Sequence, residues 1–481
     1  MGIVLFFSFF ALWLFFNWPA IHKLWWTMDD YTLLNTWDYS TIFVFGLKLG
    51  RPLSSLWWIL VVRVLYQVIH STLYAGVTIR LIQAGLHVTS STLIALLLIR
   101  FTRRKLSLLA ALPFLLWPFG SEVSYVVITG IYVTAALLSL IGVMLCINHH
   151  ESFFLRPWVG MVLIVAATLT VQSGCMLGIT VLWLCVTISL SNNTGWQQFR
   201  RPLLQVGAAY VVGAMLSVLL AFWGGEPRLI NATLFTPFTT WQLLQLAFYL
   251  LTTHPSLYPQ WLGIVHMLIF GFSLMSLMFG AIRWKETSSA VLTFFALVCL
   301  FVMSYIPLIA LGMLWVAGRT MYSSTLVYSA AICVFLQSRL PKAITTPVTL
   351  GLLSAMLVGY FPIARTFANM HVINFENDMQ TLGKLENFAT THGVSELIVA
   401  AFSEREAVNP YNLQYDWFGD SRRSAFLAEW SAQLFIQVSS RVLVNQTDPA
   451  ALAFCYSYCE NLAPRTMTIL ATPAKAICFC P

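Results

Sequence analysis

The stretch Ala209–Trp223 reads AYVVGAMLSVLLAFW and the stretch Trp158–Leu169 reads WVGMVLIVAATL, and both are apolar on every face. Across the 481 residues, 59% are hydrophobic, only 9% are charged, and the mean hydropathy is +0.78. Several apolar runs exceed the length needed to cross a hydrocarbon core of about 30 Å. Membrane β-strands alternate apolar and polar residues, which these runs do not do, so the sequence predicts an all-α polytopic membrane protein.

Basic residues mark alternate loops and so predict the orientation. They cluster at 103–105, 149–156, 200–201, 283–285 and 339–342, and the positive-inside rule assigns such short loops to the cytoplasm. Residues 3–17 have no basic stretch before them and no small-residue cleavage site after them, so we interpret them as a membrane helix rather than a signal peptide. We expect about eleven crossings, with the N-terminus cytoplasmic and the C-terminus outside, at 3–17, 77–100, 105–119, 124–147, 157–171, 174–191, 203–222, 261–281, 288–307, 322–337 and 345–363.

The segment 53–75 does not fit this alternation. It is long and apolar enough to span, yet a crossing here would move the basic loop at 103–105 to the outer side. We interpret it as a helix in the outer interface, with Trp57, Trp58 and Tyr66 at headgroup level. The alternative is an ordinary membrane helix with a shifted count.

Composition changes after Arg365. Residues 366–481 contain 11 acidic and 7 basic side chains, whereas residues 1–365 contain 7 acidic and 19 basic ones. The net charge of +8 is therefore a membrane-topology signal and not a nucleic-acid-binding patch. Strand-like segments at 396–402, 466–470 and 475–480 and helix-like segments at 379–393 and 424–435 predict a small extracytoplasmic α/β domain at 366–481, following a transmembrane domain at 1–365.

The nine cysteines divide in the same way. Five lie in or beside apolar runs and are interpreted as small core residues. The other four, Cys455, Cys459, Cys478 and Cys480, lie in the tail, and in an exported domain they predict two disulfides that join the 455/459 segment to the terminal CFC. A zinc site with CxxxC and CxC spacing is the alternative, and the sequence does not assign the pairing.

Acidic residues are scarce in the membrane domain, and three of them follow the first helix closely: Asp29, Asp30 and Asp38. Carboxylates near a bilayer are unfavourable unless they are partnered or used, so this cluster is a candidate functional site. A solvated turn or a helix cap is the structural alternative for the pair Asp29 and Asp30.

Four features together resemble the GT-C class of integral-membrane glycosyltransferases, and in particular the O-antigen-modifying glucosyltransferases of serotype-converting phages. They are Asp29–Tyr31 in the first outer loop, the following Gly50–Leu53 (GRPL), Gly318–Thr320 (GRT) before a late helix, and the short C-terminal domain. The resemblance implies an enzyme of the bacterial inner membrane. It would move a sugar, glucose in these relatives, from a polyprenyl-phosphate carrier to lipopolysaccharide O-antigen on the periplasmic face.

The expected chemistry assigns roles to individual residues. Inversion at the anomeric carbon requires a base for the attacking hydroxyl, and Asp29 or Asp30 is the candidate, with Asp30 slightly favoured. Arginines suit the leaving lipid phosphate. The outer-face candidates are Arg51 and Arg319 first, then Arg228 and Arg80. Arginines at a membrane rim also snorkel to headgroups without any catalytic role.

Further contacts with the substrate are expected from Tyr31 and from the long outer stretch 223–260, which carries Glu226, His254 and Tyr258. An aromatic-rich, helix-like run near 240–251 in this stretch is suited to the outer interface, where it would border a lipid groove, and plain packing within the bundle is the alternative. Some members of the class use a divalent ion near the first-loop carboxylates, and the sequence leaves metal dependence open.

Other functions are less well matched. The sequence has no GxGxxG, P-loop, HExxH or strand-preceded GxSxG motif, and no inner loop is large enough to bind a nucleotide sugar. A transporter or flippase usually has internal repeats and broken polar helices, which we do not find. An O-antigen polymerase or ligase is the closer rival. The resemblance also implies functional partners, namely a small flippase and a lipid-glucose synthase.

Overall fold

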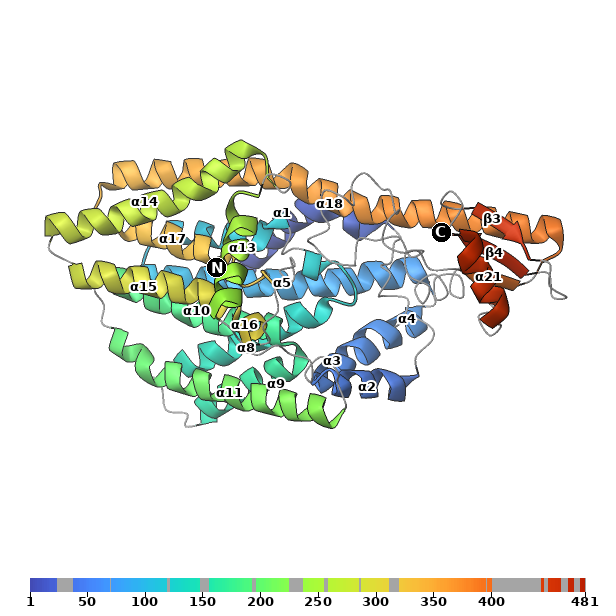
Figure 1. Cartoon of the computed structure of the whole chain (residues 1–481). Coiled ribbons are helices and arrows are strands. Elements are labelled where there is room, and N and C mark those ends of the chain that lie inside the picture. The colour runs from blue at the N-terminus through green and yellow to red at the C-terminus, as the bar shows by residue number, and fades with distance from the viewer. Residues whose placement is uncertain are drawn as a thin grey trace.

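The computed structural model describes most of the chain and confirms its helical character. The described residues are 1–23, 38–69, 71–118, 122–147, 155–192, 196–224, 237–254, 258–284, 287–310, 320–394, 396–399, 443–444, 449–459, 466–470 and 476–480. In Figure 1 the helices form an elongated bundle, and a small sheet with one helix lies at the far end of the longest helix, α18.

Each of the eleven predicted segments coincides with a helix. The corresponding elements are α1 (Gly2–His22), α5 (Thr72–Thr102), η3 with α6 (Lys105–Ala111, Leu112–Leu116), α8 (Gly130–Ile147), α9 (Leu155–Thr170), α10 (Gln172–Ser191), α11 (Arg200–Trp223), α14 (Gln260–Trp284), α15 (Thr287–Met303), α17 (Leu326–Gln337) and α18 (Lys342–His392). Among the described residues, eight helices are long and apolar enough to cross a membrane, and four shorter apolar ones accompany them. The number of crossings stays a prediction. Short helices also lie at η4 (Glu122–Ser124), η5 (Trp196–Phe199) and α16 (Ile306–Ala310).

Turns between these helices gather at two ends of the bundle. At the end nearer the C-terminal sheet, which we call the domain end, Gln83 Nε2 donates to the backbone oxygens of Val126 and Val127 at 3.0 and 2.9 Å. At the opposite end, Asn192 Nδ2 donates to Phe101 O at 3.2 Å and Ser289 Oγ to Leu190 O at 2.7 Å. The turn at 122–129 belongs to the loops expected outside, and the turns near 102 and 192 belong to those expected inside. The side of the membrane that each end faces stays a prediction.

The segment 53–75 is not a single helix. A helical run covers Pro52–Ile69 as α3 (Pro52–Leu56), a π-helical stretch η2 (Trp57–Arg63) and α4 (Val64–Ile69). A separate helix, α5, begins at Thr72, where Ser71 accepts a hydrogen bond from the backbone of Tyr74. This cap explains why α5 starts five residues before the predicted residue 77. A short helix that was not predicted, α2 (Tyr39–Lys48), precedes this region and is capped by Asp38.

The aromatic-rich run in the stretch 223–260 forms α13 (Pro237–Thr252), as predicted. The last backbone carbonyl groups of α13 have no hydrogen-bond donor within the helix. Side chains from other helices supply the donors. Tyr328 donates its hydroxyl hydrogen to Leu251 O at 2.6 Å, and His266 Nδ1 lies 2.8 Å from Thr252 O. These bonds fix the end of α13 against the bundle.

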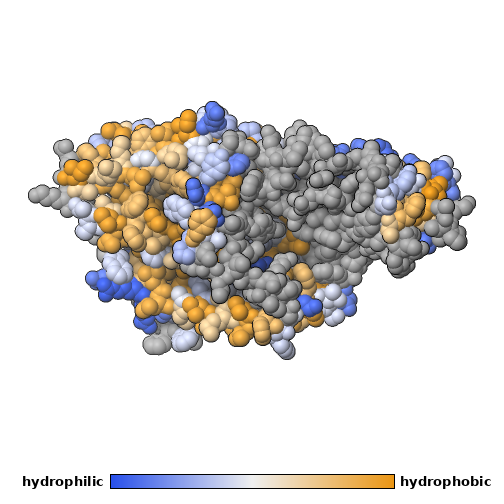
Figure 2. Space-filling model, in the orientation of Figure 1, coloured by the Kyte–Doolittle hydropathy of each residue, from blue (hydrophilic) through white to orange (hydrophobic). Residues whose placement is uncertain are grey.

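Large apolar side chains cover the outside of the bundle. On α11 and α14 the exposed ones include Leu204, Phe222, Trp223, Ile264 and Ile282, each at least 60% exposed. Figure 2 shows hydrophobic residues over most of the described surface of the bundle on this face. A soluble protein does not expose so much apolar surface, so these faces are suited to contact lipid.

The last helix continues far beyond the predicted span. It is uninterrupted from Lys342 to His392 and ends at Gly393, whose φ of 64° lies in the left-handed region that favours glycine. It therefore passes through residue 365, where composition changes. Its C-terminal part, which we call the α18 extension (366–392), connects the bundle to the sheet.

The tail forms a four-stranded sheet with strand order β2-β1-β4-β3. Its strands are β1 (Glu396–Val399), β2 (Leu443–Val444), β3 (Thr466–Ile469) and β4 (Ala476–Cys480), with β1 parallel to β2 and β4, and β3 antiparallel to β4. The three predicted strand segments are confirmed. The predicted helix at 424–435 lies outside the described residues, and the helix α21 (Pro449–Cys459) was not predicted.

Alternate residues of β4 point to opposite faces of the sheet, and each face packs against a different part of the structure. Ile477 and Phe479 belong to the large core that includes the α18 extension, whereas Cys478 and Cys480 pack in a second cluster with α21. Residues two apart in a strand lie on the same face of the sheet, and residues four apart in a helix lie on the same face of the helix. This geometry brings CxC on the strand opposite CxxxC on the helix.

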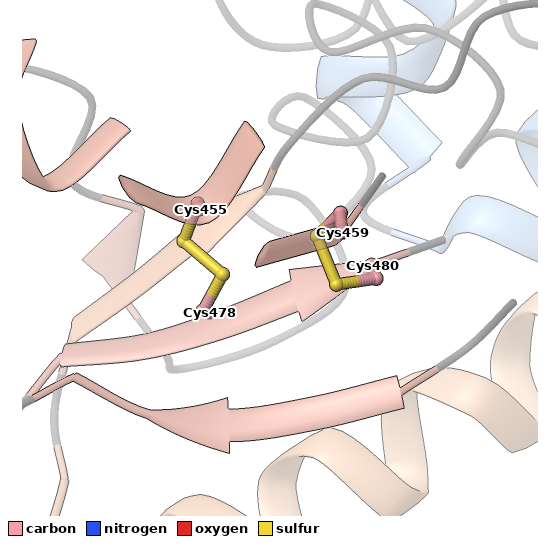
Figure 3. The surroundings of a disulfide bond; sticks show 4 residues. All are labelled: Cys455, Cys459, Cys478 and Cys480. Carbon is pink, nitrogen blue, oxygen red and sulfur yellow. A yellow bond between two sulfur atoms is a disulfide. The ribbon is translucent and has the colours of Figure 1, made fainter. Parts of the chain in front are cut away.

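Two disulfides join these elements, as predicted (Figure 3). Cys455 is bonded to Cys478 and Cys459 to Cys480, with Cα separations of 5.6 and 5.4 Å. Each closes a loop of moderate length, with sequence separations of 23 and 21, and we expect each to stabilise the domain by about 3 kcal/mol.

The pairing makes a testable prediction. Unfolded in denaturant without reductant, the chain should leave all four tail cysteines unlabelled by maleimide, and Cys455→Ser should expose one new thiol, at Cys478. Peptide mass spectrometry identifies the labelled position. A variant with all four changed to serine gives the background from the other cysteines. Labelling of Cys480 in Cys455→Ser, or labelling of any of the four tail cysteines in unreduced wild type after chelation, would contradict the pairing.

Candidate functional site

A stripe of polar side chains runs along α5 inside the bundle. Arg80, Gln83 and His87 are spaced three and four residues apart, so they share one face of the helix, and all three are fully buried. His87 Nδ1 lies 2.6 Å from the Tyr322 hydroxyl, and its Nε2 lies 3.0 Å from Leu115 O. Polar and ionisable side chains within membrane helices are unfavourable and mark functional positions by default.

Arg80 is hydrogen-bonded to the backbone at Lys23, where the loop that carries Asp29 and Asp30 begins; we call this point the root of the first loop. Its guanidinium Nη1 donates to the backbone oxygen of Lys23 at 3.2 Å. Lys23 is the last described residue before residue 38, so the predicted residues Asp29, Asp30 and Tyr31 lie outside the described residues. From Lys23 to Asp29 the chain reaches about 20 Å at most. Asp30 is one residue further, so either candidate base is within about 23 Å of the Lys23 backbone to which Arg80 is bonded.

A cavity of about 490 Å³ opens beside the same root. Its walls come from the end of α1 (His22, Lys23), the start of α5 (Leu73) and the α18 extension (Phe375, Glu376, Met379, Gln380). Across it, Lys23 Nζ and Glu376 Oε1 form an ion pair at 3.4 Å, with both side chains about half exposed. Its volume lies within the range of small-molecule sites.

Next to the cavity, the α18 extension has its own buried polar stripe. His371, Asn374 and Asp378 lie on one face of the helix and are each less than 10% exposed. The rings of His371 and Tyr125 are 5.7 Å apart. Among the described residues, Arg80 and Asp378 are the only buried side chains with a formal charge at pH 7, and they are 298 positions apart in the sequence.

Of the residues in the two stripes, only Arg80 was predicted from the sequence as a site residue. Gln83 and His87 lie in a helix that was interpreted from its hydropathy alone, and Asp378 was assigned to the tail domain. The spacing i, i+3 and i+7 was a signal that the sequence did contain. It identifies one helix face, but not the partner of that face.

Arg51 is held in place by a separate network. Its Nε donates to Gln172 Oε1 at 2.7 Å, and Gln172 in turn donates to Ser217 Oγ. Ser217 donates to Gly50 O at 2.7 Å. Gly50 has φ of 67°, and a Cβ there would lie 2.3 Å from Ser217 O, so only glycine fits. Arg51 is therefore positioned by side chains of α10 and α11.

The other predicted residues are distributed over the structure. Tyr258 is 2% exposed; its hydroxyl accepts a hydrogen bond from Trp117 Nε1 at 2.9 Å, and its ring packs on His266. His254 is half-buried against Tyr249, and burial lowers its pKa. Of the arginines, Arg51 and Arg80 are held by separate hydrogen bonds, to Gln172 and to the backbone of Lys23. Arg228, Glu226 and Arg319 lie outside the described residues.

Asp38 has a structural role. Its carboxylate accepts hydrogen bonds from the backbone of Thr41 at 2.7 Å and from Ser40 Oγ at 3.0 Å. These hydrogen bonds, those of Thr41 first, lower the pKa of Asp38. Asp38 is thus the N-cap of α2, and this separates it from the pair Asp29 and Asp30.

In the part of the chain that the structure describes, the only cluster able to hold a metal is Cys459, Cys478 and Cys480, and these side chains form disulfides. In comparisons with known proteins, no family model, no curated protein and no solved structure matches the chain.

Proposed function

We propose that the chain is an inverting glycosyltransferase that uses a sugar linked to polyprenyl phosphate as donor. The observation that carries the proposal is the buried Arg80, bonded to the backbone from which the Asp29-Asp30 loop begins, beside an open cavity. A buried cation, tethered carboxylates and space for a saccharide are the parts that such a reaction requires.

In the proposed reaction, a hydroxyl oxygen of the acceptor attacks the anomeric carbon of the donor sugar. The bond from that carbon to the phosphate oxygen breaks, its electron pair stays on the phosphate, and polyprenyl phosphate leaves. The hydroxyl proton passes to Asp30 or Asp29 as the general base. Arg80 stabilises the negative charge that grows on the phosphate, and its planar guanidinium suits two phosphate oxygens at once.

The proposed setting is the bacterial inner membrane, with the domain end at the periplasm. Two disulfides in the tail favour an oxidising compartment for that end. The proposed acceptor is lipopolysaccharide O-antigen and the proposed donor is glucosyl undecaprenyl phosphate. A lipid-glucose synthase and a flippase would supply the donor on the outer face.

The choice of donor tests the proposal. Membranes that contain the chain but no lipid-glucose synthase should glucosylate O-antigen when given glucosyl undecaprenyl phosphate, and not when given UDP-glucose. The measurement is mass spectrometry of the released polysaccharide. Lengthened chains without new side branches would indicate the polymerase alternative. Transfer from UDP-glucose, or none from a panel of polyprenyl-phosphate hexoses, would contradict the proposal.

A further inference from the structure

The cavity at the domain end offers the chemistry of a site for neutral sugars. Gln380 supplies an amide, Glu376 a carboxylate and His22 an imidazole, all able to bond hydroxyl groups, and Met379 supplies an apolar side chain. Its ionised groups compensate each other, because Lys23 pairs with Glu376. A phosphate or another polyanion would find no excess positive charge among these residues, whereas an uncharged hydroxyl-rich ligand meets hydrogen-bonding groups and an apolar wall.

The cavity lies outside the part of the bundle that a lipid chain would occupy. The wall on the α18 extension lies in a part of the helix that carries Glu376, Asp378, Lys384 and Glu386 within eleven residues, which no hydrocarbon core accommodates. A prenyl chain must remain among the apolar helices. The cavity is therefore on the aqueous side, where a water-soluble glycan arrives.

The cavity also adjoins the proposed phosphate group. Lys23 contributes its side chain to the cavity wall, while its backbone oxygen accepts the hydrogen bond from Arg80. A single residue thus links the cavity and the cation that would face the leaving phosphate. A sugar seated in the cavity is adjacent to the root of the loop that carries the proposed base.

We propose that this cavity is the acceptor subsite and that it binds a neutral, hexose-containing glycan, with Gln380 and Glu376 bonding its hydroxyl groups and the exposed Met379 lying against the apolar face of a sugar ring. This assignment rests on the proposed function, since an acceptor subsite presupposes a transferase. The stripe His371, Asn374 and Asp378 lies on the adjoining face of the extension and is buried, so these residues are not part of the proposed subsite. Discrimination comes from hydroxyl-bonding groups that an unsuitable ligand leaves unpaired.

Binding to the full-length chain in nanodiscs tests the assignment without requiring transfer. The probes are delipidated neutral O-polysaccharides and, as the charge control, polygalacturonate of similar length. Wild type should bind a neutral polysaccharide, and Gln380→Ala and Glu376→Gln should each weaken that binding about tenfold, the loss of one or two hydrogen bonds. Gln380 and Glu376 are exposed, so both variants should fold normally.

Matched controls lie on the same helix. Asn377→Ala and Glu386→Gln remove the same chemical groups from positions that do not line the cavity, and they should bind as wild type does. In the transfer assay the cavity variants should raise the acceptor KM and leave the donor KM unchanged.

The outcomes separate the two proposals. Binding that Gln380→Ala weakens, in a chain without transfer activity, would support the subsite and reject the transferase. Transfer with an unchanged acceptor KM in both cavity variants would reject the subsite alone. Failure to bind any neutral polysaccharide, or tighter binding of polygalacturonate, would also overturn the assignment.

Discussion

Replacing Asp29 or Asp30 with asparagine should reduce sugar transfer by about 10²- to 10⁴-fold in at least one case, which is the usual contribution of a positioned general base. Asparagine keeps the size of the side chain and removes its ability to accept a proton. If Asp30 is the base, Asp30→Asn should slow the chemical step, so that its kcat falls strongly while its KM changes little. If Asp29 supports the base, Asp29→Asn has the smaller effect.

Asp38→Asn is the matched control, since it changes the same chemical group in the same outer region. Asparagine is a good N-cap, so α2 should keep its first turn and transfer should stay near the wild-type rate. Protein level in the membrane and melting temperature show whether each variant is folded. Full activity of both Asp29→Asn and Asp30→Asn would show that the general base does not lie in this loop.

Replacing Arg80 is the second large effect that we expect. Arg80→Gln should lower transfer by about 10²- to 10³-fold, because the charge that develops on the leaving phosphate loses its buried donor. Arg80→Lys should recover part of the loss, since it restores the charge but not the planar fork. Both variants should weaken binding of undecaprenyl phosphate, which a purely structural role of Arg80 would not require.

Arg100→Gln is the control for Arg80, because it removes an arginine from the same helix near the opposite end of the bundle. It should leave donor binding unchanged. Arg80 is fully buried, so loss of folding in Arg80→Gln is a separate outcome that the melting temperature detects. A folded Arg80→Gln variant with normal donor binding and transfer would contradict the assigned role.

The helices of the membrane domain were predictable because one local property decides them. In lipid, an apolar run such as Ala209–Trp223 can satisfy its backbone hydrogen bonds only by forming a helix. This holds whichever helices pack beside it. The tail strands were predictable for a similar reason, since β-branched and aromatic residues alternate there over short distances. The pairing of Cys455 with Cys478 needed the register of α21 on β4, which the sequence alone does not contain.

The candidate site was only partly predictable, because it depends on contacts between distant segments. His87 meets Tyr322 from 235 positions away, and Lys23 meets Glu376 from 353 positions away. No local pattern encodes such pairs. The break at Ser71 was missed for the opposite reason, since one serine cap inside a long apolar stretch outweighs the hydropathy of its neighbours.

The most direct test of the central claim is the reaction of the purified chain, reconstituted in liposomes with glucosyl undecaprenyl phosphate and delipidated O-polysaccharide and no other protein. The account predicts that one undecaprenyl phosphate is released for each glucose attached, that the new linkage has the anomeric configuration opposite to that of the donor, and that Asp29→Asn or Asp30→Asn abolishes both. Retention of configuration, or equal activity in both variants and wild type, would contradict it.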